Sequence, residues 1–276
     1  MKYLVTGGAG FIGSNIVKKL LENGEKVRVL DNFATGKREN LFPSRDSKNF
    51  KLYEGDLRSF HIVRNAVKGV DYILHQGALP SVPRSINDPI TTNDVNILGT
   101  LNILEAAKEF GVKRVVYASS SSVYGNSEKL PKIEDMPVAP LSPYAISKYT
   151  AERYCQIYYK IYGLETICLR YFNIFGLGQD PTSQYSAVIP KFVKLMKEDK
   201  QPVIYGDGTQ SRDFTYVDNV VEANLLACIA KNVAGEVFNI ACGKRYTVLQ
   251  LAEIINKILV KNIDPVFEKE RVGDVK

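Results

Sequence analysis

The chain has 276 residues, of which 45% are hydrophobic and 24% are charged, and its formal net charge is +6. That balance is typical of a globular protein with a sizeable core, and the scattered positive charges argue against nucleic acid as a partner. No apolar run reaches the roughly 18 residues of a membrane span, the two histidines have no ligand spacing, and the four cysteines form no close pair. We therefore expect a cytoplasmic protein with no metal site and no membrane partner.

Short β-rich runs alternate with longer helical patterns through the first part of the chain. The predicted strands are Tyr3–Thr6, Val27–Asp31, Phe50–Glu54, Tyr72–His75 and Arg114–Ser119. The helical patterns between them cover Ile12–Asn23, Ser59–Val67 and Ile90–Phe110. Because the strands are almost continuously apolar and alternate with helices, they predict an α/β fold with a doubly wound parallel sheet covered by helices on both faces.

A long helical pattern and one more strand continue this alternation, which becomes irregular beyond residue 173. The later predicted helices are Pro143–Ile161, Val188–Glu198, Val217–Ala230 and Thr247–Leu259, and the later strands are Thr166–Tyr171, Val203–Tyr205 and Val237–Ile240. We therefore expect a first domain over residues 1–173 and a smaller C-terminal lobe over residues 174–276 that is interleaved with the sheet.

A glycine-rich turn, GGAGFIG at residues 7–13, stands between the first strand and the first helix. Gly7 allows a tight turn, Gly10 lets the backbone approach a pyrophosphate, and Gly13 lets the helix pack against the strand. Phe11 and Ile12 open the helix, where exposed N–H groups and the positive end of the helix dipole face the phosphates. The turn therefore predicts a dinucleotide site.

Polar and small residues follow the next strands at the same edge of the sheet. Asp31 ends the second strand, where a carboxylate accepts hydrogen bonds from the adenosine ribose and repels a 2′-phosphate, so NAD is expected in preference to NADP. Asp56 follows the third strand and is placed to reach the adenine. The cofactor-binding residues predicted at these strand ends are Asp31, Asn32, Asp56, Leu57, Gln76, Gly77 and Ala78.

Ser120, Tyr144 and Lys148 form the predicted catalytic group. Tyr144 and Lys148 lie four residues apart on one helix face, where a fixed ammonium favours the phenolate and turns a weak acid into a usable base. Ser120, at the tip of the preceding strand, can pass or steady the same proton. A Tyr-x-x-x-Lys pattern is expected about once by chance in a chain of this composition, so its meaning depends on the dinucleotide site beside it.

Segments spread over nearly the whole chain resemble the extended short-chain dehydrogenase/reductase family, and within it the NAD-dependent nucleotide-sugar 4-epimerases. They are GGAGFIG (7–13), DNFATG (31–36), GDLR (55–58), HQGALPSVPRS (75–85), NILGT (96–100), SSSSVYG (119–125), YAISK (144–148), LRYFNIFG (169–176), QSRDFTYVDNVV (210–221) and RVGD (271–274). SVPRSINDP and RYFNIFG are most similar to the branch that acts on N-acetylated UDP-hexosamines. The resemblance implies a Rossmann-like fold, NAD as cofactor and a UDP-hexose as substrate.

The resemblance also implies roles for individual residues. Ser120 and Tyr144 match the catalytic serine and the acid/base tyrosine, and Lys148 matches the lysine that binds the nicotinamide ribose and lowers the tyrosine pKa. Asn96 and Tyr171 stand where the family contacts the cofactor, as Tyr144 and Lys148 also do. On the substrate side the resemblance places Asn173, Arg212 and Arg271 at the diphosphate, Tyr205 and Val188 at the uracil and ribose, and Ser81, Arg84, Ser120, Ser121 and Tyr144 at the sugar.

The implied reaction oxidises the sugar at C4 and returns hydride to the opposite face of a 4-ketose, while NAD stays tightly bound. Sugar 4,6-dehydratases need an acid pair after the catalytic hydroxyl and UDP-glucuronate decarboxylases usually carry a glutamate there, but this chain has Ser121 and Ser122. We therefore expect a 4-epimerase of UDP-GlcNAc/UDP-GalNAc, or of UDP-Glc/UDP-Gal. The alternatives are a UDP-uronate 4-epimerase, a nucleotide-sugar dehydratase or decarboxylase, and a non-catalytic NAD-binding regulator.

In the family, a residue seven positions after the matched arginine controls by its bulk whether an N-acetyl group fits. Counted from Arg271 this is position 278, past Lys276, so we expect a truncated C-terminal segment and leave the sugar open among N-acetylated, plain and uronate forms. The resemblance further implies a homodimer, formed through the helices predicted at Ile90–Phe110 and Pro143–Ile161.

Overall fold

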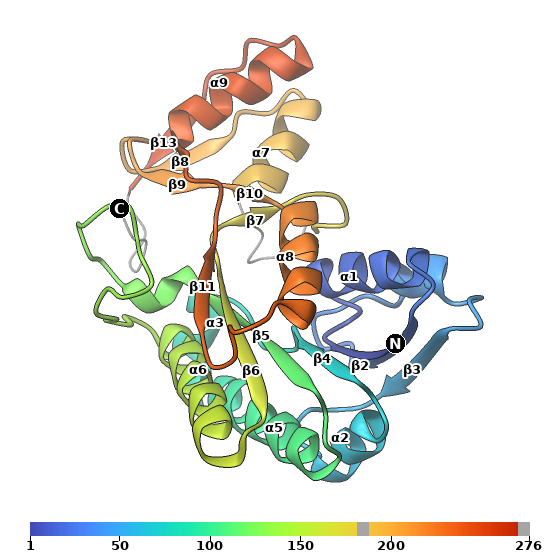
Figure 1. The fold of residues 1–276 in the computed structure, drawn as a ribbon. Helices are drawn as coiled ribbons and strands as arrows, with labels where there is room; N and C mark the ends of the chain where they lie inside the picture. The colour runs from blue at the N-terminus through green and yellow to red at the C-terminus, as the bar shows by residue number, and fades with distance from the viewer. Residues whose placement is uncertain (181–187, 270–276) are drawn as a thin grey trace.

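The largest element of the fold is a sheet of seven parallel strands in the order β11-β6-β5-β4-β1-β2-β3 (Figure 1). The computed structural model describes residues 1–180 and 188–269. The strands are β1 (Lys2–Thr6), β2 (Lys26–Asp31), β3 (Phe50–Glu54), β4 (Tyr72–His75), β5 (Arg114–Ser120), β6 (Glu165–Tyr171) and β11 (Val237–Ile240). The predicted doubly wound α/β fold is confirmed, and each of these strands begins and ends within one residue of its expected position.

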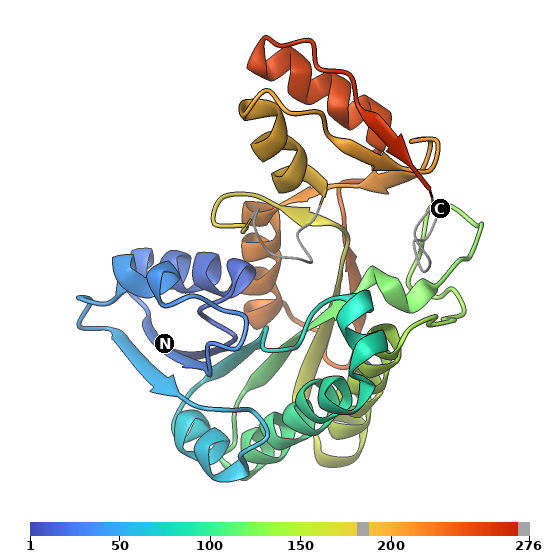
Figure 2. The same cartoon turned by 180° about the vertical axis from the view of Figure 1, so that it is seen from behind.

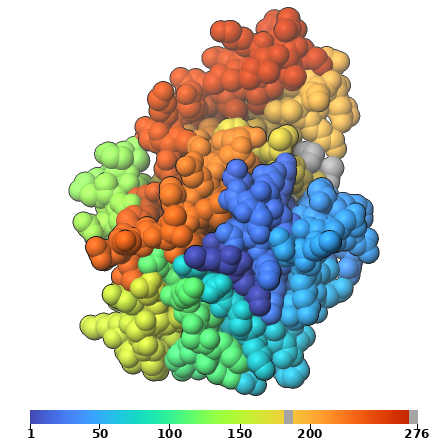
Figure 3. Space-filling view, turned by 45° about the vertical axis from the view of Figure 1, so that its right-hand side comes forward, coloured from blue at the N-terminus to red at the C-terminus, as the bar shows by residue number. Residues whose placement is uncertain are grey.

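Helices cover both faces of this sheet because successive side chains of a buried strand point to opposite faces. One layer consists of α1 (Phe11–Glu22) and α8 (Val217–Ile229), and the other of α2 (Phe60–Val67), α5 (Gly99–Glu109) and α6 (Pro143–Tyr162). In β1, Val5 packs in the core with the first layer and Leu4 packs in the core with the second. Figure 2 shows the two layers from behind, and in Figure 3 the orange surface of α8 meets the blue surface of α1.

The helical stretch before α5 carries one irregular turn. It begins with α4 (Pro89–Asn93), passes through a π-helical segment (Asp94–Leu98) and continues as α5, so the helix predicted over these residues is observed. Asp88 caps α4 by accepting a 3.0 Å hydrogen bond from the Thr91 N–H, and Pro89 suits the first position because it has no N–H to satisfy. The sequence did not predict the short helix α3 (Val82–Asn87) or the π-helical segment, which turns Asn96 into the interior.

Short ladders and two helices form the C-terminal region, at the top of Figure 1. The ladders pair β7 (Ile174–Phe175) with β10 (Thr215–Tyr216), β8 (Val203–Tyr205) with β13 (Val266–Glu268), and β9 (Ser211–Asp213) with β12 (Arg245–Thr247). Helices α7 (Val188–Lys197) and α9 (Val248–Leu259) pack around Phe192 and Leu251. Because α8 and β11 return to the large sheet, this region is interleaved with it; the domain boundary at residue 173 stays a prediction.

No helix in the described ranges is long and apolar enough to cross a membrane.

Candidate active site

The predicted cofactor and catalytic residues lie at the carboxyl edge of the large sheet, near the point between β1 and β4 where the strand order reverses. At this point Gly7 has a φ of +64°, and its N–H donates to the Leu30 carbonyl over 2.9 Å. A Cβ on Gly7 would lie 2.8 Å from the Cα of Gly77, and a Cβ on Gly13 would lie 2.2 Å from the Gly7 carbonyl oxygen. The turn after β1, the start of α1 and the end of β4 therefore approach more closely than side chains would allow, which is the packing that a dinucleotide turn requires.

The start of α1 is open to an anion. Gly10 is its N-cap residue and offers no side chain to the first N–H groups of the helix, which Phe11 and Ile12 begin. Those N–H groups carry the positive end of the helix dipole. An anionic pyrophosphate would satisfy them, so this turn fits the diphosphate of a dinucleotide.

Two ordered carboxylates follow the turn at the ends of β2 and β3. Asp31 accepts hydrogen bonds from the backbone N–H of Ala9 at 2.9 Å and of Phe33 at 2.8 Å, one on each oxygen. Each oxygen keeps a further lone pair that a ribose hydroxyl could use. Asp56 is held by Arg58, whose hydrogen bonds lower the pKa of Asp56 to about 2, and it also accepts from Asn32. The edge is therefore negatively charged where a 2′-phosphate would have to lie.

A buried histidine connects the end of β1 to the helix behind β4. His75 lies between the hydroxyls of Thr6, 2.6 Å from Nδ1, and Thr100, 2.9 Å from Nε2. Thr100 donates its proton to the Asn96 carbonyl over 2.6 Å, so its oxygen must accept from Nε2–H, and Nδ1 must accept from Thr6. Burial, together with the charge of Lys148, lowers the pKa of His75 to about 3, so the ring is neutral.

Thr6 and Asn96 extend this chain of hydrogen bonds to the loop after β4. Thr6 accepts from the Gly77 N–H over 3.0 Å. Asn96 accepts from the Leu79 N–H over 2.7 Å and donates to the Leu79 carbonyl and to the Ser147 hydroxyl. Asn96 is 1% exposed and holds the loop and α6 together, while its contact with the cofactor stays a prediction.

A second buried group joins three elements at the ends of β4 and β6. The Tyr171 hydroxyl donates to the Gln76 side-chain carbonyl over 3.1 Å and accepts from Asn224 over 2.7 Å, while Gln76 donates to the Asn224 side-chain carbonyl over 3.0 Å. Asn224 belongs to α8, and the sequence did not single it out. Leu57 and Ala78 lie beside this edge, Leu57 buried and Ala78 half-buried.

The predicted catalytic residues come together at the tips of β5 and α6. Ser120 ends β5, and Ser142 caps α6 through a 3.1 Å hydrogen bond from the Ala145 N–H, which places Tyr144 in the first turn of the helix. The Ser120 hydroxyl lies near enough to Tyr144 to lower the pKa of that phenol. The Lys148 ammonium donates to the Ala118 carbonyl over 2.8 Å and lies 5.9 Å from the centre of the Tyr144 ring.

The pKa of Tyr144 differs from the expectation that Lys148 lowers it. Burial raises the pKa of Tyr144, and the nearby Ser120 hydroxyl only partly offsets that effect. Burial also lowers the pKa of Lys148, to about 8. Both groups lose the hydration that would favour their charged forms, and the ammonium is bonded to a carbonyl in place of the phenol oxygen.

The predicted substrate residues that the structure describes fall into two groups, one beside β5 and α6 and one in the C-terminal region. Ser81 has a φ of +93° and caps α3, which also holds Arg84 and packs against α6; Ser121 begins a 3₁₀ turn after β5. Asn173 has a φ of +36° and donates to the Asp213 carbonyl over 3.1 Å. In the C-terminal region, Val188 begins α7, Tyr205 ends β8 and Arg212 lies in β9. Arg271 falls outside the described residues.

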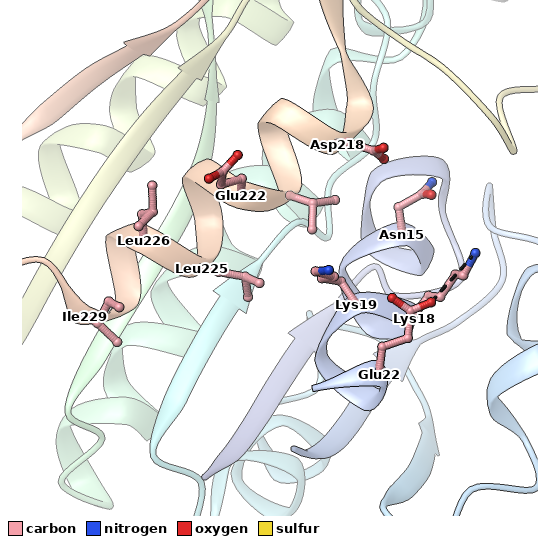
Figure 4. A pocket seen from close by; sticks show the side chains of 10 residues that line it. Asn15, Lys18, Lys19, Glu22, Asp218, Glu222, Leu225, Leu226 and Ile229 are labelled. Carbon is pink, nitrogen blue, oxygen red and sulfur yellow. Dashed lines mark ion pairs between the residues drawn. The ribbon is translucent and has the colours of Figure 1, made fainter. Parts of the chain in front are cut away.

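A separate groove lies between α1 and α8 (Figure 4). Its walls combine apolar side chains such as Leu225 and Ile229 with charged ones, including an exposed 3.9 Å ion pair between Lys18 and Glu22. None of the predicted site residues lines it.

Within the described ranges, no cluster of three or more His, Cys, Asp or Glu side chains could hold a metal ion.

A glycine turn with no room for side chains, an acidic strand end and a Ser-Tyr-Lys group on one sheet edge define an NAD-dependent enzyme of the Rossmann type. The sequence matches the NAD dependent epimerase/dehydratase family over residues 3–241, and the chain belongs to this family. NAD is its cofactor, and the glycine turn and Asp31 described above fit that molecule.

Three solved structures resemble the whole chain. UDP-N-acetylglucosamine 4-epimerase from Methanobrevibacter ruminantium M1, in complex with UDP-N-acetylmuramic acid, is 41% identical with a TM-score of 0.95, over 100% of this chain and 87% of that one. UDP-glucose 4-epimerase from Thermotoga maritima, with UDP-glucose, is 39% identical with a TM-score of 0.93, over 100% and 88%. UDP-glucuronic acid 4-epimerase from Bacillus cereus, with UDP-glucuronic acid and NAD, is 34% identical with a TM-score of 0.92, over 100% and 88%. The chain is a nucleotide-sugar 4-epimerase, an isomerase.

Proposed function

We propose that the enzyme interconverts UDP-GlcNAc and UDP-GalNAc, and also accepts UDP-Glc and UDP-Gal. The choice of sugar is supported by the likeness to the Methanobrevibacter ruminantium enzyme, and the reaction is supported by the set of hydroxyls at the tip of β5. Ser120 accepts hydrogen bonds from the backbone N–H and the hydroxyl of Ser122, at 3.2 and 2.9 Å, and Ser121 stands between them. Dehydratase and decarboxylase chemistry needs a carboxyl group at these positions, so oxidation and re-reduction at C4 is the reaction that these side chains support.

In this mechanism Tyr144 removes the proton from the sugar 4-hydroxyl and returns it after the sugar has turned over. Ser120 hydrogen-bonds the same oxygen and shares the proton with Tyr144. The ammonium of Lys148, 5.9 Å from the centre of the Tyr144 ring, is proposed to favour the phenolate in opposition to burial, which raises the pKa of Tyr144, because a nearby opposite charge stabilises the ionised form. NAD, when bound, would accept the hydride from C4 and give it back to either face of the 4-ketose.

We assign the cofactor to the glycine turn, the ends of β2 to β4 and the tip of α6. The residues proposed to contact NAD are Gly7, Gly10, Phe11, Ile12, Gly13, Asp31, Asn32, Asp56, Leu57, Gln76, Gly77, Ala78, Tyr144, Lys148 and Tyr171. Asn96 is also proposed to contact NAD, and it holds the loop at Leu79 through both ends of its amide.

We further assign the UDP-sugar to residues of the C-terminal region and of α3. Asn173 and Arg212 are proposed at the diphosphate, Tyr205 and Val188 at the uracil and ribose, and Ser81, Arg84 and Ser121 at the sugar. Strained positive φ values at Ser81 and Asn173 support this, because such conformations concentrate at ligand sites. A UDP-uronate is the second candidate substrate, supported by the similarity to the Bacillus cereus enzyme.

The substrate is tested by incubating the purified protein, without added NAD, with UDP-GlcNAc, UDP-Glc or UDP-GlcA and following the configuration at C4 by NMR. We expect inversion of UDP-GlcNAc, weaker inversion of UDP-Glc and none of UDP-GlcA. Inversion of UDP-GlcA alone would replace the proposal by the uronate reaction, and inversion of none of the three would contradict it.

We also propose a homodimer that forms through α4 to α6, in a reducing cytoplasmic compartment. Exposed apolar side chains on these helices support the dimer: Ile90, Ile146, Ile157, Ile161 and Tyr162. The four cysteines are free thiols, in keeping with a reducing compartment. Sedimentation equilibrium of the wild type and of Ile161→Glu tests the assembly; we expect a dimer that the charged variant weakens, whereas two monomeric species would contradict it.

A further inference from the structure

The tip of β5 is tied to one face of α6 at neighbouring residues. The carbonyl of Ala118 accepts from Lys148, and the hydroxyl of Ser119 donates to the carboxylate of Glu152. Ser120, the next residue, lies near Tyr144 and lowers the pKa of its phenol. The three helix residues are four positions apart, so they stack on one face of α6 opposite three consecutive strand residues. Glu152 completes this set one turn beyond Lys148.

Glu152 is held in place by a buried arginine. Arg170 of β6 donates its Nε to one carboxylate oxygen over 3.0 Å and its Nη2 to the other over 2.9 Å. The side chain of Glu152 is 1% exposed and that of Arg170 is 5% exposed. Arg170 also donates to the Tyr124 hydroxyl over 2.8 Å, which anchors the fork to the turn that follows Ser120. A two-fold Arg–carboxylate contact fixes orientation as well as charge.

The charged and titratable groups around Lys148 come from several elements. His75 of β4 is neutral, the ring of Tyr117 in β5 lies 5.1 Å from the ammonium, and Cys155 follows on α6. Glu152 contributes the carboxylate of this set, and its charge raises the pKa of Lys148 against the lowering caused by burial. Arg170 faces Glu152 from β6 and balances that carboxylate.

We propose that Glu152 is a positioning residue of the enzyme, which keeps Lys148 charged and, through Ser119, holds Ser120 at the place where the sugar oxygen binds. This proposal rests on the roles assigned above to Ser120 and Lys148. Glu152 contacts neither cofactor nor substrate; it acts through the ammonium and through the end of β5. Neutralising the carboxylate and deleting the Ser119 hydroxyl should therefore affect different properties of the enzyme.

The charge effect is tested with Glu152→Gln, which keeps the shape of the side chain. The titration of Lys148 is followed by NMR on protein labelled with ε-¹³C lysine, and the signal is identified by its loss in Lys148→Arg. We expect the pKa of Lys148 to fall by about one unit in Glu152→Gln, because a nearby opposite charge is gone. The alkaline limb of the kcat profile should move to lower pH by the same amount. An unchanged pKa overturns the proposal, and so does a rise, which would mean that water had entered a disordered core.

The positional effect is tested with Ser119→Ala. We expect kcat to fall about tenfold while the pKa of Lys148 stays in place, since a small misplacement of Ser120 is costly; unchanged kcat would remove Ser119 from the proposal. The control is Glu165→Gln. Glu165 is the ion-pair partner of another buried arginine, Arg114, and this pair lies at the end of β5 and β6 far from Ser120. Both readouts should stay at wild-type values there. If the wild type inverts no sugar, the proposed function fails, and the lysine titration still decides the role of Glu152.

Discussion

The packing of the glycine turn at the predicted cofactor site requires that residue 13 has no side chain. A Cβ at this position would meet the Gly7 carbonyl oxygen at 2.2 Å, which is backbone and cannot swing aside. We expect Gly13→Ala to lower the free energy of unfolding by about 1–3 kcal/mol, because the helix must move away from the turn. The same movement should release NAD. Urea unfolding and the NAD recovered after denaturation measure the two effects.

Gly111 provides the control for that substitution. Its φ is +63° and nothing lies within 4 Å of the place that a Cβ would take, so Gly111→Ala costs about 1 kcal/mol of backbone strain without any steric clash. NAD should remain bound at the wild-type level. Equal loss of NAD in both variants would show that general destabilisation, and not the shape of the turn, controls cofactor retention.

A substitution at Tyr144 should reduce turnover while leaving cofactor binding intact. Tyr144→Phe removes the hydroxyl whose pKa Ser120 lowers and leaves the ring in place. We expect kcat to fall by a factor of about 10³ or more, in the range of a lost general acid–base group, with NAD still bound. Tyr154→Phe, on the same helix, should retain full activity. Turnover in Tyr144→Phe comparable to the wild type would refute the mechanism.

At the scale of elements, the caps of two helices allow stability and activity to be compared. Ser142 caps α6, which carries Tyr144, and Thr247 caps α9: its hydroxyl accepts from the Gln250 N–H, and its own N–H donates to the Gln250 side-chain carbonyl. Each alanine substitution should cost about 1 kcal/mol, because one helix N–H loses its acceptor. Thermal unfolding measures that loss. Only Ser142→Ala should also lower kcat; a similar loss of kcat in Thr247→Ala would contradict this.

How well the sequence predicted an element depended on how deeply that element is buried. The strands of the large sheet are covered on both faces, so each appears as an apolar run with clear ends. By contrast, β12 and β13 are almost wholly exposed and left no such pattern, and α3 is a short helix that contains a proline. These elements depend on pairing partners distant in the sequence, which a local pattern does not contain.

The same distinction applies to the site. Motif residues such as Asp31 and Ser120 could be predicted because parallel strands bring all their carboxyl ends to one edge. Asn224 could not be, since its contact with Tyr171 exists only after α8 has docked on the sheet. Glu152 did leave a signal: it lies on the face of α6 already marked by Tyr144 and Lys148.

At the scale of the whole molecule, His75 makes stability depend on pH. Its pKa falls from 6.5 to about 3 on folding, so below about pH 6.5 the unfolded chain binds a proton that the folded chain does not. Stability contributed by His75 is therefore present at neutral pH and is lost as the pH falls toward the folded pKa. Between about pH 7 and about pH 4 we expect a loss of about 3 kcal/mol from this residue.

Two variants isolate that contribution in urea unfolding at both pH values. His75→Asn should be less stable than the wild type at neutral pH, yet its stability should fall less on acidification. His61→Asn changes the other histidine, which is exposed, and should keep the slope of the wild type. An identical slope in all three proteins would mean that other groups cause the acid sensitivity.

The position of β11 has a consequence for the order in which the protein can be made. Val237 pairs with Cys168, and the residues of α7, β8 and β9 are synthesised between them. Until that late segment leaves the ribosome, β6 is the open border of the sheet, with a row of unpaired backbone groups next to the strand that carries Ser120. During part of its synthesis, the nascent chain therefore has β5 and β6 available to pair while β6 is still an exposed edge strand. Chaperones would be needed most during this interval.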